Sequence, residues 1–237
     1  MKPTVVLVHG AFAESASWNG VVARLRERSV DVVAAANPLR GLAGDAAYVR
    51  DVVASVDGPV VLVGHSYGGM VVTAAAAGNE QVAGLVYVCA FAPDQGESAF
   101  GLSTKFPGST LGEAVDAHLV STGGVELVIR PSAFHAQFAA DVPAAQAALM
   151  AATQRPVTQD ALTAGLPTDQ PGWKTIPSWF VIGDQDRNIP AELQRFLAAR
   201  AGAKDVREVA GGSHALSVSR PDVVTESILD AVAAVSA

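Results

Sequence analysis

The chain has 237 residues, of which 50% are apolar, so it is long enough for one large domain with a substantial buried core. The formal net charge is −7, and no cluster of lysine and arginine offers the electrostatic footprint that nucleic acid or an anionic membrane surface requires, which excludes both as expected partners. No apolar run reaches the roughly 18 residues of a membrane span, and the sequence opens without the charged leader and apolar stretch of a signal peptide, so we expect a cytoplasmic protein.

Short β-branched runs alternate along the chain with segments of helical period. The first two strands are expected at residues 4–8 and 30–36, and apolar residues at helical spacing predict helices around residues 18–25 and 49–56. Each strand is nearly continuously apolar, as a strand buried on both faces of a sheet should be. This alternation predicts a parallel sheet of about six strands joined by crossover helices, which is an α/β fold.

The third predicted strand, residues 60–63, runs straight into the pentapeptide Gly64-His65-Ser66-Tyr67-Gly68. A small-residue segment suited to a helix follows, so the pentapeptide has the strand, turn and helix context of a nucleophile elbow. In such an elbow the serine occupies strained backbone and its hydroxyl projects at the top of the sheet. No phosphate-loop lysine follows Gly64, which argues against a nucleotide site. Ser66 is therefore predicted to be a nucleophile.

The fourth strand is expected at residues 85–88, directly before Cys89. Because Cys89 is the single cysteine of the chain, no intramolecular disulfide forms, and a buried core thiol is favoured over a reactive one.

From residue 97 to residue 175 the alternation stops. Short helical pieces such as residues 111–119 and 144–152 are separated by Gly, Ser, Thr and Pro. An insertion of this length is too long to be a structureless loop in a compact domain. We expect residues 97–175 to form a helical cap over the carboxyl edge of the sheet, and residues 1–96 and 176–237 to form the core.

The last two strands are expected at residues 178–182 and 206–209, before a final helix that starts with Pro221 at its first turn. Asp186 follows the fifth strand and His214 follows the sixth. Loops at the carboxyl ends of parallel strands meet at one edge of the sheet, so both side chains can converge on the elbow.

The chemistry needs a residue of each of these types. A serine hydroxyl is a poor nucleophile until an imidazole takes its proton, and a carboxylate must fix the tautomer of that imidazole. Ser66, Asp186 and His214 are therefore the predicted catalytic residues. Asp184 and Asp94 are alternatives for the acid. His9 is expected to be structural.

With these motifs together, and with His9-Gly10 after the first strand, the chain resembles the α/β-hydrolase superfamily over nearly its whole length. It is most similar to the compact branch that contains plant methyl-ester esterases, hydroxynitrile lyases and small bacterial esterases. The resemblance implies that Ala11 and Tyr67 lend backbone N–H groups to an oxyanion hole, with Phe12 as the alternative to Ala11. Two such donors aimed at a developing alkoxide are worth about 3 to 4 kcal/mol each.

Single residues separate the chemistries of this superfamily. Ser66 stands where dehalogenases and epoxide hydrolases carry an aspartate, and Ala215 stands where the related lyases carry a lysine. The resemblance therefore implies a serine carboxylesterase that forms an acyl-enzyme with a small to medium apolar ester. The alternatives are a cofactor-free haloperoxidase or perhydrolase with the same triad, and a small-molecule-binding relative without catalysis.

No metal and no cofactor are expected, because no metal-ligand spacing occurs in the sequence. The expected partner is a small-molecule ester, and either a monomer or a homodimer is compatible with the sequence. An apolar pocket is expected for the substrate. Its predicted lining residues are Phe12, Phe134, Phe138, Trp173 and Leu216, with Phe100 and Phe106 as further candidates.

Overall fold

A six-stranded sheet with the strand order β2-β1-β3-β4-β8-β9 lies at the centre of the computed structural model, which describes residues 2–121 and 123–236. All five strand pairings within this sheet are parallel, so the predicted α/β fold is confirmed. The strands are β1 (Thr4–Val8), β2 (Val32–Ala35), β3 (Val60–His65), β4 (Val82–Val88), β8 (Ser178–Gly183) and β9 (Asp205–Val209).

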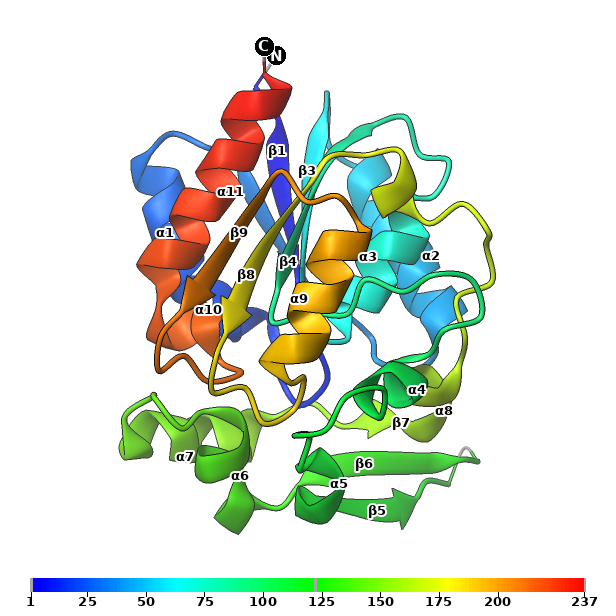
Figure 1. Ribbon diagram of the computed structural model, residues 1–237, viewed down its shortest axis with the longest axis vertical. Helices are drawn as coiled ribbons and strands as arrows, with labels where there is room; N and C mark the ends of the chain where they lie inside the picture. Colours follow the sequence, from blue (N-terminus) through cyan, green and yellow to red (C-terminus); the bar gives the residue numbers. More distant parts are fainter. Residues whose placement is uncertain (1, 122, 237) are drawn as a thin grey trace.

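Helices cover both faces of this sheet, as parallel crossover connections require (Figure 1). One face carries α1 (Asn19–Glu27), which follows the short helix η1 (Ser15–Trp18), together with α10 (Leu216–Ser219) and α11 (Pro221–Val235). The other face carries α2 (Leu42–Ala54), α3 (Gly68–Ala76) and α9 (Ala191–Arg200).

Two apolar cores result from the alternation of side chains along the strands. Val5 and Leu7 of β1 point into the core under α1 and α11, whereas Val6 and Val8 point into the core on the side of α2 and α3. All four side chains are fully buried, which is why β1 is apolar from Val5 to Val8. The central strands are therefore rigid supports for the loops at their carboxyl ends.

Residues 97–175 lie across the carboxyl edge of the sheet (Figure 1). Their helices are α4 (Ala99–Ser103), α5 (Leu111–Ala114), α6 (Pro131–Phe138), α7 (Ala144–Thr153), α8 (Gln159–Thr163) and η2 (Gly172–Lys174). Their strands β5 (Val115–Leu119), β6 (Val125–Ile129) and β7 (Val157–Thr158) form a second, antiparallel sheet. The segment expected to be a helical cap therefore also contains strands, and the helix expected at residues 111–119 is wrong in its second half, which forms β5.

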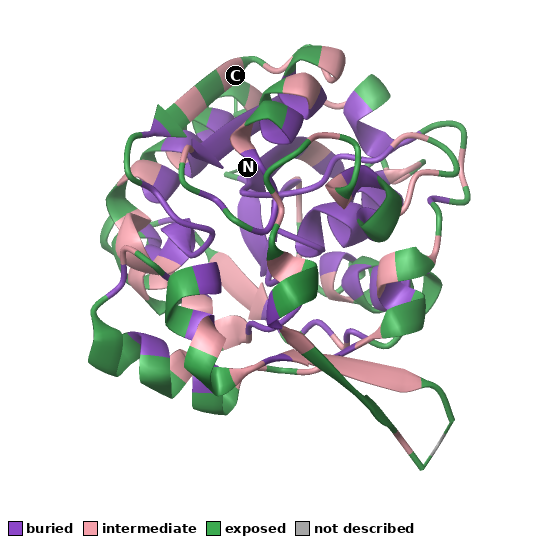
Figure 2. Cartoon of the chain, turned by 60° about the horizontal axis from the view of Figure 1, so that its bottom comes forward, coloured by how far each residue is buried: buried purple, intermediate pink, exposed green. Residues whose placement is uncertain are grey.

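Burial differs strongly between these two parts of the chain. Figure 2 shows buried strands and facing helices in the centre, and a β5–β6 hairpin that projects outward with exposed and intermediate residues. Four of the five residues of β5 are exposed. Among the described residues, no helix combines the length and the apolar character needed to cross a membrane.

Candidate active site

The turn between β3 and α3 holds Ser66 in a left-handed backbone conformation, with a φ of 53°. Its neighbours must be glycines for steric reasons. A Cβ atom on Gly64 would lie 2.7 Å from the carbonyl oxygen of Gly68, and a Cβ atom on Gly68 would lie 2.4 Å from the carbonyl oxygen of Val8. The backbone segments therefore meet too closely at Gly64 and Gly68 for a side chain at either position.

The loop after β1 lies directly beside this serine. A Cβ atom on Gly10 would lie 2.6 Å from the Cβ atom of Ser66 and 3.2 Å from its Oγ. Ser66 is 7% exposed and lines a cavity that is described below. The hydroxyl is thus enclosed by the backbone at residues 9–11 and is still accessible from the cavity.

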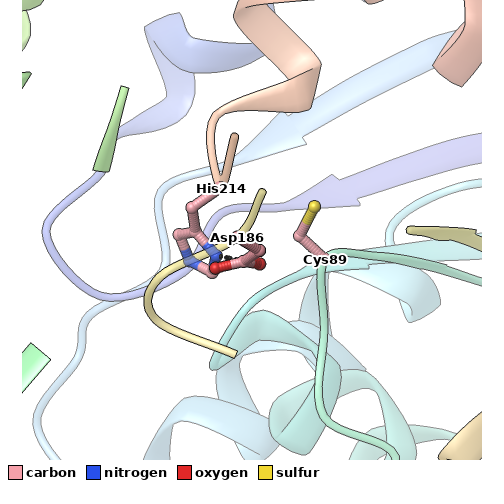
Figure 3. Close-up of side chains that lie close together, drawn as sticks. All are labelled: Cys89, Asp186 and His214. Carbon is pink, nitrogen blue, oxygen red and sulfur yellow. Dashed lines mark hydrogen bonds and ion pairs between the residues drawn. The ribbon is translucent and has the colours of Figure 1, made fainter. Parts of the chain in front are cut away.

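His214 and Asp186 form a buried pair in the loops after β9 and β8 (Figure 3). Nδ1 of His214 lies 2.7 Å from Oδ2 of Asp186. The same carboxylate accepts hydrogen bonds from the backbone N–H groups of Asn188 and Ile189 and from the side-chain amide of Gln194. These donors fix the orientation of the carboxylate, and a carboxylate oxygen facing Nδ1 accepts from the imidazole tautomer that carries its proton there.

The other imidazole nitrogen, Nε2 of His214, is buried and has no hydrogen-bond partner within the described residues. An unprotonated Nε2 is the atom that acts as a general base in a serine triad. The alternative acids do not contact this histidine. Asp184 accepts from the backbone N–H of Gly211, and Asp94 pairs with Lys174.

Two aromatic side chains surround the imidazole of His214. The ring of Phe138 packs edge-on against it with a centroid distance of 4.9 Å, and the ring of His65 lies 4.7 Å away. Nε2 of His65 is 2.9 Å from the backbone carbonyl oxygen of His214, to which it donates. Burial holds the pKa of His65 well below its usual range, so this ring stays neutral and fixes the loop that carries His214.

His9 plays a structural part in the neighbouring loop. Its Nδ1 lies 3.0 Å from the carbonyl oxygen of Gly10, and burial lowers its pKa to about 4. The expectation of a structural His9 agrees with this bond.

The backbone N–H groups near Ser66 differ in whether they already donate a hydrogen bond within the protein. Phe12, in a left-handed conformation with a φ of 60°, donates its N–H to the carbonyl oxygen of Arg155 at 3.2 Å. Across the described part of the chain, the N–H groups of Ala11 and Tyr67 donate to no protein acceptor. Of the two donors considered for the first position, Ala11 is therefore the one with a free hydrogen.

Cys89 lies against the same pair, so that its Sγ, a carboxylate oxygen of Asp186 and a ring nitrogen of His214 fall within 4.8 Å of one another (Figure 3). No spacing in the sequence indicates this proximity. Burial raises the pKa of the Cys89 thiol well above its usual range, and Asp186 adds to this effect. A protonated thiol is a poor metal ligand, and the carboxylate oxygens already accept four hydrogen bonds, so the group does not suit a metal ion.

A cavity of about 370 Å³ opens in front of Ser66, between the main sheet and the segment of residues 97–175. No charged side chain of the described residues lines it. Its apolar walls are formed by Ala11, Phe12, Phe91, Ala99, Phe100, Phe106, Pro107, Leu111, Val115, Leu127, Leu162 and Ile189. The residues with polar side-chain atoms that line it are Ser66, Tyr67, Ser103, Thr104, Ser109 and Asn188.

The cavity corrects most of the lining that the sequence suggested. Phe12 lines it, but Phe134, Phe138, Trp173 and Leu216 do not. Phe134 stacks on Phe138, which faces His214. Trp173 donates its Nε1–H to the carbonyl oxygen of Pro93, and Leu216 packs in the core under α1 and α11. Each of these four side chains packs against other parts of the protein and not against the cavity.

Three kinds of comparison place the chain among known proteins. The family model described as "Alpha/beta hydrolase family" matches residues 5–227. The alpha/beta hydrolase nvfD of Aspergillus novofumigatus is 29% identical, over 98% of this chain and 97% of that protein. Esterase PIR7B of Oryza sativa subsp. japonica is also 29% identical, over 93% of this chain and 92% of that protein.

A solved structure shares the same architecture. The crystal structure of polyneuridine aldehyde esterase superimposes with a TM-score of 0.83, covers 97% of this chain and 99% of that chain, and is 21% identical. At this identity the likeness concerns the fold, because function depends on the residues of each site.

Proposed function

The chain belongs to the alpha/beta hydrolase family, and from this premise we propose that it is a serine carboxylesterase with Ser66, Asp186 and His214 as its catalytic residues. The observation that carries the proposal is the buried His214–Asp186 pair, whose Nε2 has no hydrogen-bond partner within the described residues. A serine in strained backbone that lines an apolar cavity supports it. The names of relatives such as Esterase PIR7B support the same reaction class.

In the proposed mechanism, Nε2 of His214 takes the hydroxyl proton as Oγ of Ser66 forms a bond to the ester carbonyl carbon. The carbonyl π electrons move to oxygen, and the N–H groups of Ala11 and Tyr67 stabilise that oxyanion. The tetrahedral intermediate then collapses, the C–O bond to the alcohol breaks, and His214 returns the proton to the leaving alkoxide. Water attacks the acyl-enzyme with the same imidazole as base and restores Ser66.

The walls of the cavity support an uncharged, apolar substrate of small to medium size. A volume of about 370 Å³ suits such a group, and its lining offers no counter-ion to a charged one. Burying an unpaired charge there would cost several kcal/mol. A neutral acyl or alcohol group is therefore preferred over an ester that carries a free carboxylate.

Ser66→Ala tests the proposal. We expect the wild-type protein to hydrolyse p-nitrophenyl butyrate and to bind a fluorophosphonate probe at Ser66 by mass spectrometry, and the variant to do neither while its circular dichroism spectrum is retained. The matched anionic ester, p-nitrophenyl hemisuccinate, should show a kcat/KM at least about tenfold lower. Undiminished turnover in the variant would refute the serine mechanism. An unlabelled wild-type serine would favour a binding protein instead.

A further inference from the structure

The tyrosine that follows Ser66 is anchored at its far end by a buried carboxylate. The hydroxyl of Tyr67 donates to Oδ2 of Asp45 at 2.9 Å. Tyr67 is fully buried, and Asp45, in the first turn of α2, is 1% exposed. Tyr67 lines the cavity, and its side chain connects it to α2. No described residue of α2 lines the cavity.

Asp45 is held by several donors. Its Oδ1 accepts from the backbone N–H of Arg40 at 3.0 Å, and its Oδ2 accepts from that of Gly41 at 3.4 Å. The positive end of the α2 dipole also favours a negative charge in the first turn of the helix. Burial, together with the neighbouring Asp45 charge, raises the pKa of Tyr67 far above its usual range, so its hydroxyl keeps the proton that it donates.

The loop of residues 37–41, whose backbone donates to Asp45, also forms hydrogen bonds on the opposite side of the elbow. The side-chain amide of Asn37 donates to the carbonyl oxygen of His9 at 2.9 Å. The carbonyl oxygen of Leu39 accepts from the N–H of Thr158, and Arg155, three residues earlier, accepts the N–H of Phe12. The loop of residues 37–41 is therefore connected by hydrogen bonds both to Asp45, which holds Tyr67, and to the chain at His9 and, through residues 155–158, at Phe12.

We propose that Asp45 is a positioning residue for the oxyanion hole, which acts through the Tyr67 side chain to fix the Tyr67 N–H relative to the Ala11 N–H. The inference rests on the proposed esterase function of this site. Oxyanion donors lower the barrier because they are aligned before the charge develops. The Tyr67 N–H follows the strained Ser66 backbone, so its direction depends on what holds Tyr67 in place.

Tyr67→Phe and Asp45→Asn test this inference, and Tyr87→Phe is the matched control. Tyr87 is also a fully buried tyrosine with a hydrogen-bonded hydroxyl, 2.8 Å from Oγ1 of Thr73, and it does not line the cavity. With p-nitrophenyl butyrate, we expect kcat to fall about tenfold in each test variant while KM stays within about twofold, because the oxyanion exists only in the transition state. Tyr87→Phe should keep the wild-type kcat.

A trifluoromethyl ketone, whose adduct with Ser66 carries an oxyanion, supplies the second readout. Its inhibition constant should rise about tenfold, in parallel with the fall in kcat, in Tyr67→Phe and in Asp45→Asn. The double variant should be no worse than the worse single variant, since both substitutions act on the same Tyr67–Asp45 hydrogen bond. Tyr67→Phe keeps the shape of the core and so remains informative if Asp45→Asn folds poorly.

The outcomes separate this inference from the proposed function. Wild-type kcat and inhibitor affinity in Tyr67→Phe would overturn the positioning role while leaving an active, Ser66-dependent esterase. Equal losses in Tyr67→Phe and Tyr87→Phe would also overturn it, since they would indicate a general effect of a lost buried hydroxyl. A wild-type protein without Ser66-dependent hydrolysis would instead refute the proposed function.

Discussion

At the residue scale, Gly10 shows how closely the backbone encloses the reacting serine. A side chain there would place its Cβ atom 2.6 Å from the Cβ atom of Ser66 and 2.7 Å from the carbonyl oxygen of His65. Gly10→Ala must therefore shift the elbow or the loop after β1. A misplacement of about 1 Å in a reacting group costs about a hundredfold in rate. We expect kcat/KM for p-nitrophenyl butyrate to fall by about this factor.

Gly44→Ala is the matched control for this substitution. Gly44 lies in α2, and a Cβ atom there would meet no atom within 4 Å. Alanine should raise the free energy of unfolding by about 0.5 to 1 kcal/mol in urea titrations, because glycine is a poor helix former, and should leave kcat/KM unchanged. Wild-type kcat/KM in Gly10→Ala would show that the loop adapts without moving Ser66.

Individual residues of the site differ in how far the sequence could predict them. The positions of Ser66, Asp186 and His214 follow from local patterns, because each one lies in the loop after a recognisable strand and parallel strands bring such loops together. The pocket aromatics could not be chosen in this way. Whether Phe134 or Phe106 faces the cavity depends on the path of the backbone between them, which residue type alone does not encode.

At the element scale, the β5–β6 hairpin is the feature that the sequence does not predict. Val115, Ala117 and Leu119 do alternate with polar residues, but the run is short, follows directly on the helix α5, and is largely exposed. Its partner β6 carries a more apolar sequence and supplies Leu127 to the cavity. Short strands that are only partly buried give a weak periodic signal, and the small-residue and proline punctuation around them favours helical pieces and turns.

At the end of β6, the side chain of Gln154 makes the backbone hydrogen bonds that a neighbouring strand would otherwise make. Its Oε1 accepts from the N–H of Ile129, and its Nε2 donates to the carbonyl oxygen of Ile129, both at 2.9 Å. Gln154→Met would leave both backbone groups of this buried residue without partners. We expect the free energy of unfolding in urea to fall by about 1 to 3 kcal/mol.

Gln159→Met is the control, because Gln159 is exposed and its side chain makes no hydrogen bond within the described residues. The free energy of unfolding of this variant should stay within about 0.5 kcal/mol of the wild-type value. If the two variants were equally stable, the Gln154 amide would not hold the strand end.

At the scale of the whole molecule, two buried neutral histidines couple stability to pH. Burial lowers the pKa of His9 from 6.5 to about 4, and it lowers that of His65 well below 6.5. Between these values the unfolded chain binds protons that the folded chain does not. The free energy of unfolding must therefore fall as the pH falls from about 6.5 toward 4. The stabilisation that comes from keeping these histidines neutral is complete above about pH 6.5.

The size of this loss follows from the shift of His9. A shift from 6.5 to about 4 is worth about 3 kcal/mol over the whole window, and His65 adds a loss of the same sign. Urea titrations at pH 7, 6 and 5 test this above the range in which ordinary carboxylates titrate. A free energy of unfolding that is constant from pH 7 to pH 5 would mean that the folded protein takes up these protons too, and that the loops around Ser66 open to water before the rest of the molecule unfolds.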